Sequence, residues 1–151
     1  MRVSEAFECK NAKVHDMQPI KPGLAGESTK VVTKQMTAAS FGSGLVSAFA
    51  SPAMIALMEN AGVNAIQQYL ESGETSVGVE VSVKHLAATP VRMRVRARAE
   101  VVKVDRRRVT FRVEAWDERE KIGEGTHVRV IIDEAEFKAR ISEKTSQTQE
   151  S

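Results

Sequence analysis

Residues 51–70 read SPAMIALMENAGVNAIQQYL, and residues 71–85 continue as ESGETSVGVEVSVKH. Within the first segment, spacings of three and four predict one helix face made of Ile55, Met58, Glu59, Gly62 and Ile66. Ser51 is a favourable N-cap, Pro52 is a favourable first helical residue, and Ser72-Gly73 supplies a stop. We therefore predict a single helix of about five turns.

After Gly73 the pattern changes to a period of two, which is typical of strands with one buried face. The first predicted strand has these residues on its inward side: Val77, Val79, Val81, Val83 and His85. The second has Val91, Met93, Val95, Ala97, Ala99 and Val101 inward. A turn at Asp105-Arg106 leads to a third strand, whose inward residues are Val109, Phe111, Val113 and Ala115. Another turn at 117–120 leads to a fourth strand over 121–132.

Short turns make these strands antiparallel neighbours, and the apolar face of their sheet needs a cover. The helix at 51–70 is the available one, so we predict an α+β fold with an antiparallel sheet wrapped around one long central helix. An opening strand at Val3–Val14 and a loop at 20–28, IKPGLAGES, complete one domain over 1–137. We expect the polar tail at 138–151 to fray. Uncovered sheet edges favour a homodimer, with a tetramer as the alternative.

The composition fits one globular domain, since 42% of the 151 residues are hydrophobic and 28% are charged. The one cysteine, Cys9, cannot form an internal disulfide, and the three histidines match no metal-ligand spacing. We therefore expect no metal site and a reducing compartment. Residues 1–14 carry charges where a secretory signal would be apolar, which predicts a cytoplasmic protein.

An uncharged stretch from Gln35 to Met58 is long enough to span a bilayer. Gly42, Gly44 and Pro52 interrupt it, together with several Ser and Thr residues, and its content of large apolar residues is low. We predict a loop over a buried site that runs into the helix, and no membrane partner.

Seven arginines gather on the second predicted strand and its turn: Arg92, Arg94, Arg96, Arg98, Arg106, Arg107 and Arg108. This pattern is typical of a solvated strand face and a charged hairpin tip. The alternative is a basic rim for the phosphates of a nucleotide-bearing substrate. A net charge of only +2 and the scarcity of aromatic residues argue against a nucleic-acid partner.

Glu59 is the first charge after the uncharged stretch, and it lies on the apolar face of the predicted helix. A buried carboxylate needs a partner, although one at a helix edge can instead reach water or a nearby cation. His85 takes the inward side of its strand, where an imidazole also needs a partner. If Glu59 and His85 face one space, they can share a proton and keep the carboxylate ready to activate water or attack a carbonyl.

Ser51, at the helix entrance, could add a hydroxyl to this group or serve only as the N-cap. The backbone N–H groups of that helix end could polarise a carbonyl. A serine nucleophile is disfavoured because the chain lacks a G-x-S-x-G elbow. His127 and Arg129 share one side of the last strand, either as supporting groups or, more simply, as surface residues. Trp116 takes the solvent-facing side, as a dimer or ligand contact or as a plain strand end.

Several stretches resemble the hotdog thioesterases similar to fluoroacetyl-CoA thioesterase. They are AFASPAMIALMENAGVNAIQQYLESGETSVG (48–78), VSVKHLAATP (81–90), RVTFRVEAWDEREKIGEGTHVRVII (108–132) and EFKARISEKT (136–145). The H-x-A-A-T-P and G-x-G-T-H-x-R segments are the most specific. The resemblance covers about Ala48 to Thr145 and implies a hotdog fold and the hydrolysis of an acyl-CoA thioester.

The resemblance also implies the roles of individual residues. Glu59 would act as nucleophile or general base, His85 would assist proton transfer to water and thiolate, and Ser51 would orient the carboxylate. Gly78, through its backbone, and Arg129, toward the acyl end, would lie near the substrate. It implies no bound cofactor, since CoA is part of the substrate.

The loop before the helix departs from the pattern of the fluoroacetyl-specific enzyme. That enzyme carries phenylalanines in its lid, whereas residues 40–50 here read SFGSGLVSAFA, with Gly42 and Leu45 at the lid positions. A short- or medium-chain acyl-CoA is therefore a better expectation than fluoroacetyl-CoA. Two alternatives stay open: a module that binds or senses acyl-CoA without turnover, and a hotdog hydratase or dehydratase acting on 3-hydroxyacyl thioesters.

Overall fold

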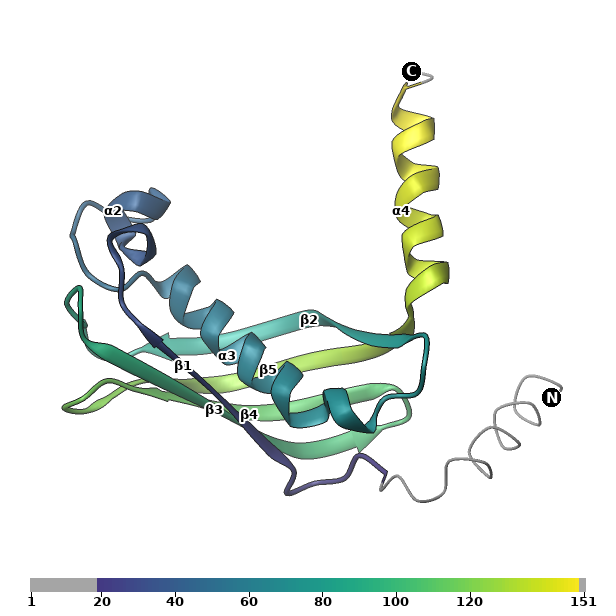
Figure 1. The fold of residues 1–151 in the computed structure, drawn as a ribbon, viewed down its shortest axis with the longest axis horizontal. Helices are drawn as coiled ribbons and strands as arrows, with labels where there is room; N and C mark the ends of the chain where they lie inside the picture. The colour runs from purple at the N-terminus through teal and green to yellow at the C-terminus, as the bar shows by residue number, and fades with distance from the viewer. Residues whose placement is uncertain (1–18, 150–151) are drawn as a thin grey trace, which may run out of the picture.

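The computed structural model describes residues 19–149, which form a curved five-stranded sheet with a long helix in its concave face (Figure 1). The strands are β1 (Ala25–Val31), β2 (Glu74–His85), β3 (Arg94–Asp105), β4 (Arg108–Trp116) and β5 (Lys121–Asp133). The helices are α2 (Ala38–Phe41), α3 (Ser51–Ile66) and α4 (Glu134–Gln149), with 3-10 turns η1 (Lys34–Met36) and η2 (Gln67–Tyr69). Neighbours in the order β1-β3-β4-β5-β2 are all antiparallel. The predicted wrapping of an antiparallel sheet around one long helix is confirmed.

Helix α3 begins at the predicted Ser-Pro step, but Ser51 is not its N-cap. Ala50 takes that position, with no side-chain hydrogen bond, and proline lies in the first turn. The hydroxyl of Ser51 is therefore not used for capping. The helix ends at Ile66, and the residues after it tighten into η2, as the last turn of a helix often does.

The core lies between α3 and the middle strands of the sheet. Two residues predicted inward on the second strand, Val91 and Met93, precede β3 and are partly buried. The other inward residues predicted for β3 and β4 are all buried: Val95, Ala97, Ala99, Val101, Val109, Phe111, Val113 and Ala115. From α3 they meet Met54, Leu57, Met58, Ala61, Ala65 and Ile66. Burying a side chain of the size of Phe or Met contributes about 1.5–3 kcal/mol, so this layer dominates the stability of the domain.

Strand β1 was missed in the sequence, because a loop was predicted over residues 20–28. The strand begins inside that segment, at Ala25, and pairs with β3 along its whole length. Gly26 is what allows it, since a Cβ there would collide with the backbone of Ala61 and Ala65 on α3. The glycine that suggested a loop instead permits close packing of β1 on the helix. The opening strand predicted at 3–14 lies outside the described residues.

Strand β2 follows the predicted alternation only in its second half. Its register with β5 shifts between Gly78 and Glu80, so one extra residue, Val79, interrupts the pairing. Before this bulge Ser76 and Gly78 face α3, and after it the inward side passes to Val81, Val83 and His85. The prediction that Val77 and Val79 face inward is therefore wrong, because a bulge reverses the alternation of a strand.

The convex face of the sheet carries the alternating arginines in ion pairs. Arg96 contacts Glu27 at 2.8 Å, and its guanidinium carbon lies 4.5 Å from the centre of the Trp116 ring. Arg98 and Arg112 share Glu100, at 2.8 and 3.3 Å. Of the arginines predicted to form a solvated face, Arg96 is thus paired with Glu27 on β1, and Arg98 is paired with Glu100 on its own strand.

The tail predicted to fray is helical instead. Helix α4 starts directly after β5 and projects away from the sheet (Figure 1), so the expected boundary between 137 and 138 falls inside it. Its first turn holds Glu134 and Glu136, which suit a helix N-terminus. Phe137 and Ile141, one turn apart on α4, are exposed.

The uncharged stretch from 35 to 58 forms α2, a loop and the start of α3, as the predicted loop running into a helix requires. None of the helices within residues 19–149 combines the length and the apolar character that crossing a membrane demands.

Candidate active site

The first part of the site joins the start of α3 to the end of β2. Ser51 Oγ lies 2.8 Å from His85 Nδ1. The other ring nitrogen, Nε2, is buried and has no hydrogen-bond partner within the described part of the chain. Burial lowers the pKa of His85, an effect that the Ala87 backbone partly opposes. At neutral pH the ring is therefore uncharged and can exchange a proton with a bound molecule through Nε2.

The second part of the site surrounds Glu59, two turns further along α3. Its side chain is 39% exposed, and Oε2 lies 3.7 Å from NH1 of the buried Arg129 on β5. The carboxylate is thus accessible from outside while a cation faces it from the sheet. This is neither the fully solvated helix-edge glutamate nor the fully buried one considered from the sequence.

Arg129 is held by β2 and by its own strand. Its Nε donates to Ser76 Oγ at 2.9 Å, and its NH2 donates to the Ser76 carbonyl at 3.0 Å. Its NH1 lies 3.2 Å from Nε2 of His127, which is only 1% exposed. The interpretation of His127 and Arg129 as surface residues is wrong, because α3 covers this part of β5.

Gly78 leaves the space in which Glu59 sits. A Cβ built on Gly78 would lie 2.7 Å from Glu59 Oε2 and 3.1 Å from His127 Cε1. Any side chain at this position would push the carboxylate away. The residue that the resemblance places near the substrate therefore lies directly beside the Glu59 carboxylate.

The predicted site residues thus lie on one flank of α3 in two clusters. Ser51 and Glu59 are eight residues apart, which corresponds to about 12 Å along a helix axis. Side chains lean toward the helix N-terminus, so Glu59 leans toward the first cluster. No hydrogen bond or ion pair within residues 19–149 joins Glu59 to His85, so the direct sharing of a proton expected from the sequence is replaced by a gap between the two clusters.

Known families and proteins include clear relatives of this chain. The family model described as fluoroacetyl-CoA-specific thioesterase matches residues 32–135. The fluoroacetyl-CoA thioesterase of Streptantibioticus cattleyicolor is 44% identical over 97 residues, covering 64% of this chain and 70% of that protein.

The chain belongs to the fluoroacetyl-CoA-specific thioesterase family.

Solved structures extend the match to the fold. A structure of the fluoroacetyl-CoA thioesterase superimposes with a TM-score of 0.80 at 34% identity, covering 84% of this chain and 98% of the other. A thioesterase superfamily member from Thermus thermophilus gives a TM-score of 0.83 at 34% identity, covering 89% of this chain and 100% of the other. The predicted hotdog fold and the predicted class of enzyme, an acyl-CoA thioester hydrolase, are confirmed for this member of the fluoroacetyl-CoA-specific thioesterase family.

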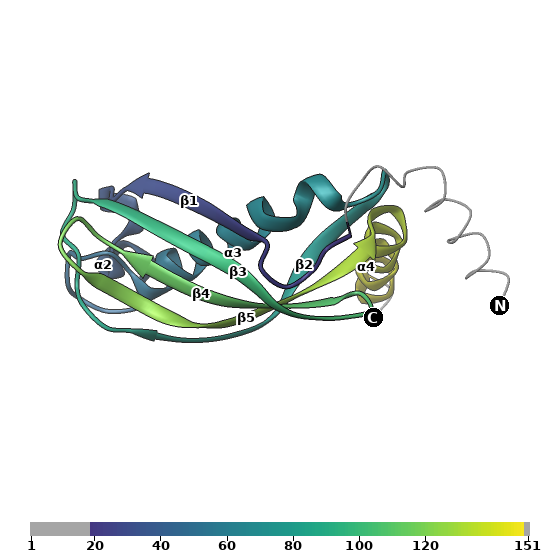
Figure 2. The same ribbon diagram turned by 90° about the horizontal axis from the view of Figure 1, so that it is seen from below.

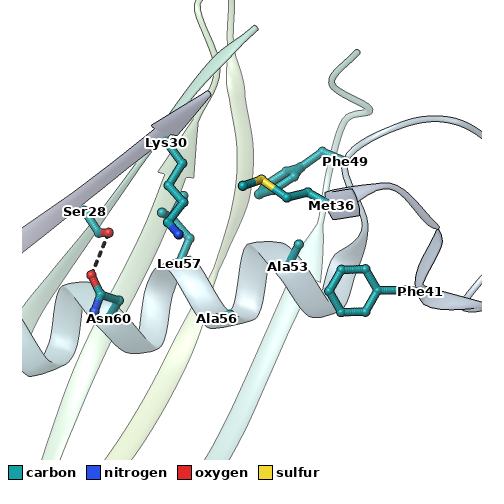
Figure 3. Close-up of a pocket in the computed structure, with 9 residues that line it drawn as sticks. All are labelled: Ser28, Lys30, Met36, Phe41, Phe49, Ala53, Ala56, Leu57 and Asn60. Carbon is teal, nitrogen blue, oxygen red and sulfur yellow. Dashed lines mark hydrogen bonds between the residues drawn. The ribbon is translucent and has the colours of Figure 1, made fainter. Parts of the chain in front are cut away.

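This family member has a further cavity of about 400 Å³ on the opposite flank of α3 (Figure 3). It lies toward β1, whereas Glu59 lies toward β2, and these strands are the two opposite edges of the sheet. Its lining is mostly apolar, with polar side chains at one end: Ser28, Lys30, Met36, Phe41, Phe49, Ala53, Ala56, Leu57 and Asn60. At that end, the Ser28 hydroxyl donates to Asn60 Oδ1 at 2.8 Å.

Across the described residues, the histidines and carboxylates form no group of three that could hold a metal ion. Two of the arginines proposed as a phosphate rim, Arg96 and Arg98, also lie away from Glu59, because they alternate with Val95, Ala97 and Ala99, which are buried against α3. Figure 2 shows the sheet curved around α3.

One member of the site was not predicted as such. His127 has the inward parity of β5, but alternation alone cannot say whether a helix covers that end of a strand. The G-x-G-T-H-x-R segment contained the signal, because the two glycines before His127 mark a strand that others approach closely.

Proposed function

We propose that this protein hydrolyses short- or medium-chain acyl-CoA thioesters, with Glu59 as nucleophile or general base and with His85 and Ser51 assisting. The observation that carries this proposal is the placement of Glu59: a partly exposed carboxylate on the buried face of α3, facing the Arg129 guanidinium at 3.7 Å. A carboxylate placed in this way can attack a thioester carbonyl or take a proton from water.

His85 and Ser51 suit the handling of the leaving group. When Nδ1–H of the neutral ring donates to Ser51 Oγ, Nε2 keeps a free lone pair. Hydrolysis needs a proton for the departing CoA thiolate, and Nε2 can take that proton from a water molecule and pass it to the thiolate. Ser51 lies in the first turn of α3 and holds the His85 ring beside that turn, where backbone N–H groups favour developing negative charge on a carbonyl oxygen.

The nature of the substrate is supported by solved relatives. One structure of the fluoroacetyl-CoA-specific thioesterase holds fluoroacetate and CoA, at 35% identity, and another holds acetyl-CoA, at 36% identity. In this chain Gly78 and Arg129 flank the Glu59 carboxylate, where the acyl end would lie.

The segment from 42 to 47, which precedes α3, does not close over the protomer, since Leu45 is 97% exposed. An acyl chain longer than fluoroacetyl therefore has room on this side.

We also propose that the protein works as a homodimer through the β2 edge. Helix α3 packs mainly on β1 and β3, so the half of the sheet formed by β5 and β2 is less covered. On β2, Val79 is 51% exposed and Val81 is 38% exposed. An apolar edge strand with unpaired backbone groups is a surface that a second copy can cover, and this edge borders the proposed site.

The activity is tested by incubating the full chain with acyl-CoAs from acetyl to palmitoyl, with one aromatic acyl-CoA and with fluoroacetyl-CoA, while release of free thiol is followed. We expect release to be fastest with short or medium chains and to fall by about 100-fold or more in Glu59→Gln. Glu143→Gln, an exposed glutamate on α4, is the matched control and should match the unchanged protein. Thiol release that stays within about twofold in Glu59→Gln would refute the catalytic assignment.

A further inference from the structure

His127 is a buried histidine whose two ring nitrogens both have defined partners. Nδ1 lies 2.9 Å from the backbone carbonyl of Glu80 on β2. Nε2 lies 3.2 Å from NH1 of Arg129, two residues further along β5. The ring also stacks on Phe111 of β4, with centroids 6.0 Å apart. Both ring nitrogens and one face of the imidazole therefore have defined partners.

These partners select one protonation state of the ring. A carbonyl oxygen can only accept, so Nδ1 must carry the hydrogen. A guanidinium can only donate, so Nε2 must offer its lone pair to Arg129. A doubly protonated ring would direct an N–H group at the cation. Burial lowers the pKa of His127 and the charge of Arg129 acts in the same direction, against the Glu80 backbone contact and the charge of Glu59.

The bulge in β2 takes part in this selection. The register shifts between Gly78 and Glu80, and it is the carbonyl of Glu80, just after the shift, that accepts from His127. The Glu80 side chain contacts Arg108 at 3.1 Å instead. Apart from Glu59 on α3 and Arg129 on β5, no charged side chain among the described residues contributes to the pKa of His127.

We propose that His127 is a positioning residue for hydrolysis: as the Nδ1–H tautomer it fixes, together with Ser76, the Arg129 guanidinium that faces and orients the Glu59 carboxylate. The proposal rests on the proposed catalytic role of Glu59. Three of the four close contacts of Arg129 come from Ser76 and His127, and the fourth is Glu59 itself. Without the acceptor on His127, NH1 keeps only its contact with Glu59, and the planar guanidinium can tilt about its two contacts with Ser76. A misplacement of about 1 Å at a reacting group can lower the rate by about 100-fold.

The test compares two amides that each reproduce one side of the ring. The amide of His127→Asn lies near the position of Nδ1 and keeps the contact with Glu80, but it offers nothing to Arg129. The amide of His127→Gln reaches the position of Nε2 and can accept from Arg129. We expect kcat to fall at least about tenfold in the asparagine variant with KM within about threefold, and to stay within about threefold of the original in the glutamine variant.

A second measurement does not depend on activity. The ¹⁵N shifts of the His127 ring should show one protonated and one unprotonated nitrogen from pH 8 to pH 6.5, with Nδ1 protonated. A ring with Nε2 protonated, or one that is already mostly doubly protonated at pH 6.5, would overturn the proposal.

The remaining outcomes are also decisive. If the asparagine variant keeps its kcat, or if both amides lose kcat and melting temperature equally, His127 acts only in packing and the positioning role is refuted. If the asparagine variant does not fold, Ser76→Ala removes a different support of the same guanidinium, and an unchanged kcat there refutes the proposal. Glu59→Gln, measured in parallel, separates the two hypotheses. If Glu59→Gln is fully active, the proposed function is refuted, and the positioning role with it. If Glu59→Gln is inactive while His127→Asn is fully active, the positioning role alone is refuted.

Discussion

Ser51 and His85 are joined by a hydrogen bond of 2.8 Å that runs from the first turn of α3 to the last residue of β2. Because Ala50 is the N-cap of the helix, this hydroxyl serves the imidazole and not the helix end. The same bond fixes the ring, and with it the direction of the buried Nε2. The activity and the stability of the protein should therefore respond differently to changes at Ser51.

Replacing Ser51 by Ala should lower kcat by at least about tenfold, since the His85 ring loses the partner that orients it. The melting temperature should change little, because losing a true N-cap costs about 1 kcal/mol and this serine is not one. Ser51→Thr keeps the hydroxyl and should retain most of the rate. Thiol release and thermal unfolding measure the two effects. A marked loss of stability with unchanged kcat would show that Ser51 is a cap after all.

Gly78→Ala should abolish most of the activity while the protein still folds. Its Cβ would lie 2.7 Å from Glu59 Oε2, so the end of a flexible side chain must move while the backbone does not. We expect a loss in kcat of about 100-fold. Gly62→Ala is the matched control, because its Cβ would meet Arg129 Cδ at 3.4 Å and His127 Cδ2 at 3.5 Å, close to ordinary contact. Equal activity of the two variants would contradict the proposed position of the carboxylate.

Stability should fall as the pH drops below about 6.5. The pKa values of His85 and His127 are lowered from their usual value of 6.5, mainly by burial. The unfolded chain therefore binds more protons than the folded one once the pH falls through 6.5, and protonation favours unfolding. The carboxylates with lowered pKa values, Glu100, Asp117 and Glu124, act only below their usual values of 4.5, 3.8 and 4.5.

Thermal unfolding at pH 7.5, 6.5 and 5.5 measures this effect. His127→Gln, which does not titrate, should show a smaller decrease than the original protein. A melting temperature that is constant or rises over this range would mean that neither ring is held neutral.

The arginines of the convex face should be dispensable for binding CoA. Arg96 and Arg98 are paired with Glu27 and Glu100 and lie on the side of the sheet away from α3. Double replacement by Ala should leave KM for an acyl-CoA within about twofold and cost at most about 1 kcal/mol per exposed pair. Steady-state kinetics at low and moderate salt checks this. A tenfold rise in KM would restore the interpretation of these residues as a phosphate rim.

A charge on the β2 edge should separate the proposed dimer. Val81→Lys places an ammonium on the inward side of the edge strand, where a second copy would bury it. Val102→Lys is the control, since that valine is comparably exposed, at 42%, but belongs to β3 inside the sheet. Light scattering coupled to size exclusion should give a dimer mass for the original chain and for the control, and a monomer mass for Val81→Lys. A monomeric original chain, or a dimeric Val81→Lys, would remove the β2 edge as the interface.

Periodicity in the sequence was enough to locate most of the elements. Spacings of three and four place α3, and spacings of two place β3 and β4 with the correct residues inward, because these segments are covered by one continuous apolar layer. The inward parity of Glu59 and His85, together with the resemblance, predicted that Ser51, Glu59 and His85 lie near one another. In the structure, Ser51 and His85 are hydrogen-bonded, whereas Glu59 faces Arg129.

Features that depend on two segments meeting were beyond the reach of local patterns. Strand β1 is a strand because Gly26 lets it approach α3, although its glycine and the proline before it favour a loop when viewed alone. The tail forms α4 although it has no apolar face that predicts a helix. The bulge at Val79 reverses the inward side of β2, and nothing in the alternation of valines announces it.

By itself, the sequence therefore determined helix α3, the succession of strands from β2 to β5, and the position of the rare ionisable groups on apolar faces, since these follow from neighbouring residues in the chain. Only the tertiary structure decided that His127 and Arg129 are buried, that Glu59 faces Arg129 and not His85, and that Arg96 and Arg98 of β3 form ion pairs. The physical reason is that burial, desolvation and ion pairing depend on the groups that approach from other segments, and a local pattern does not contain those distances.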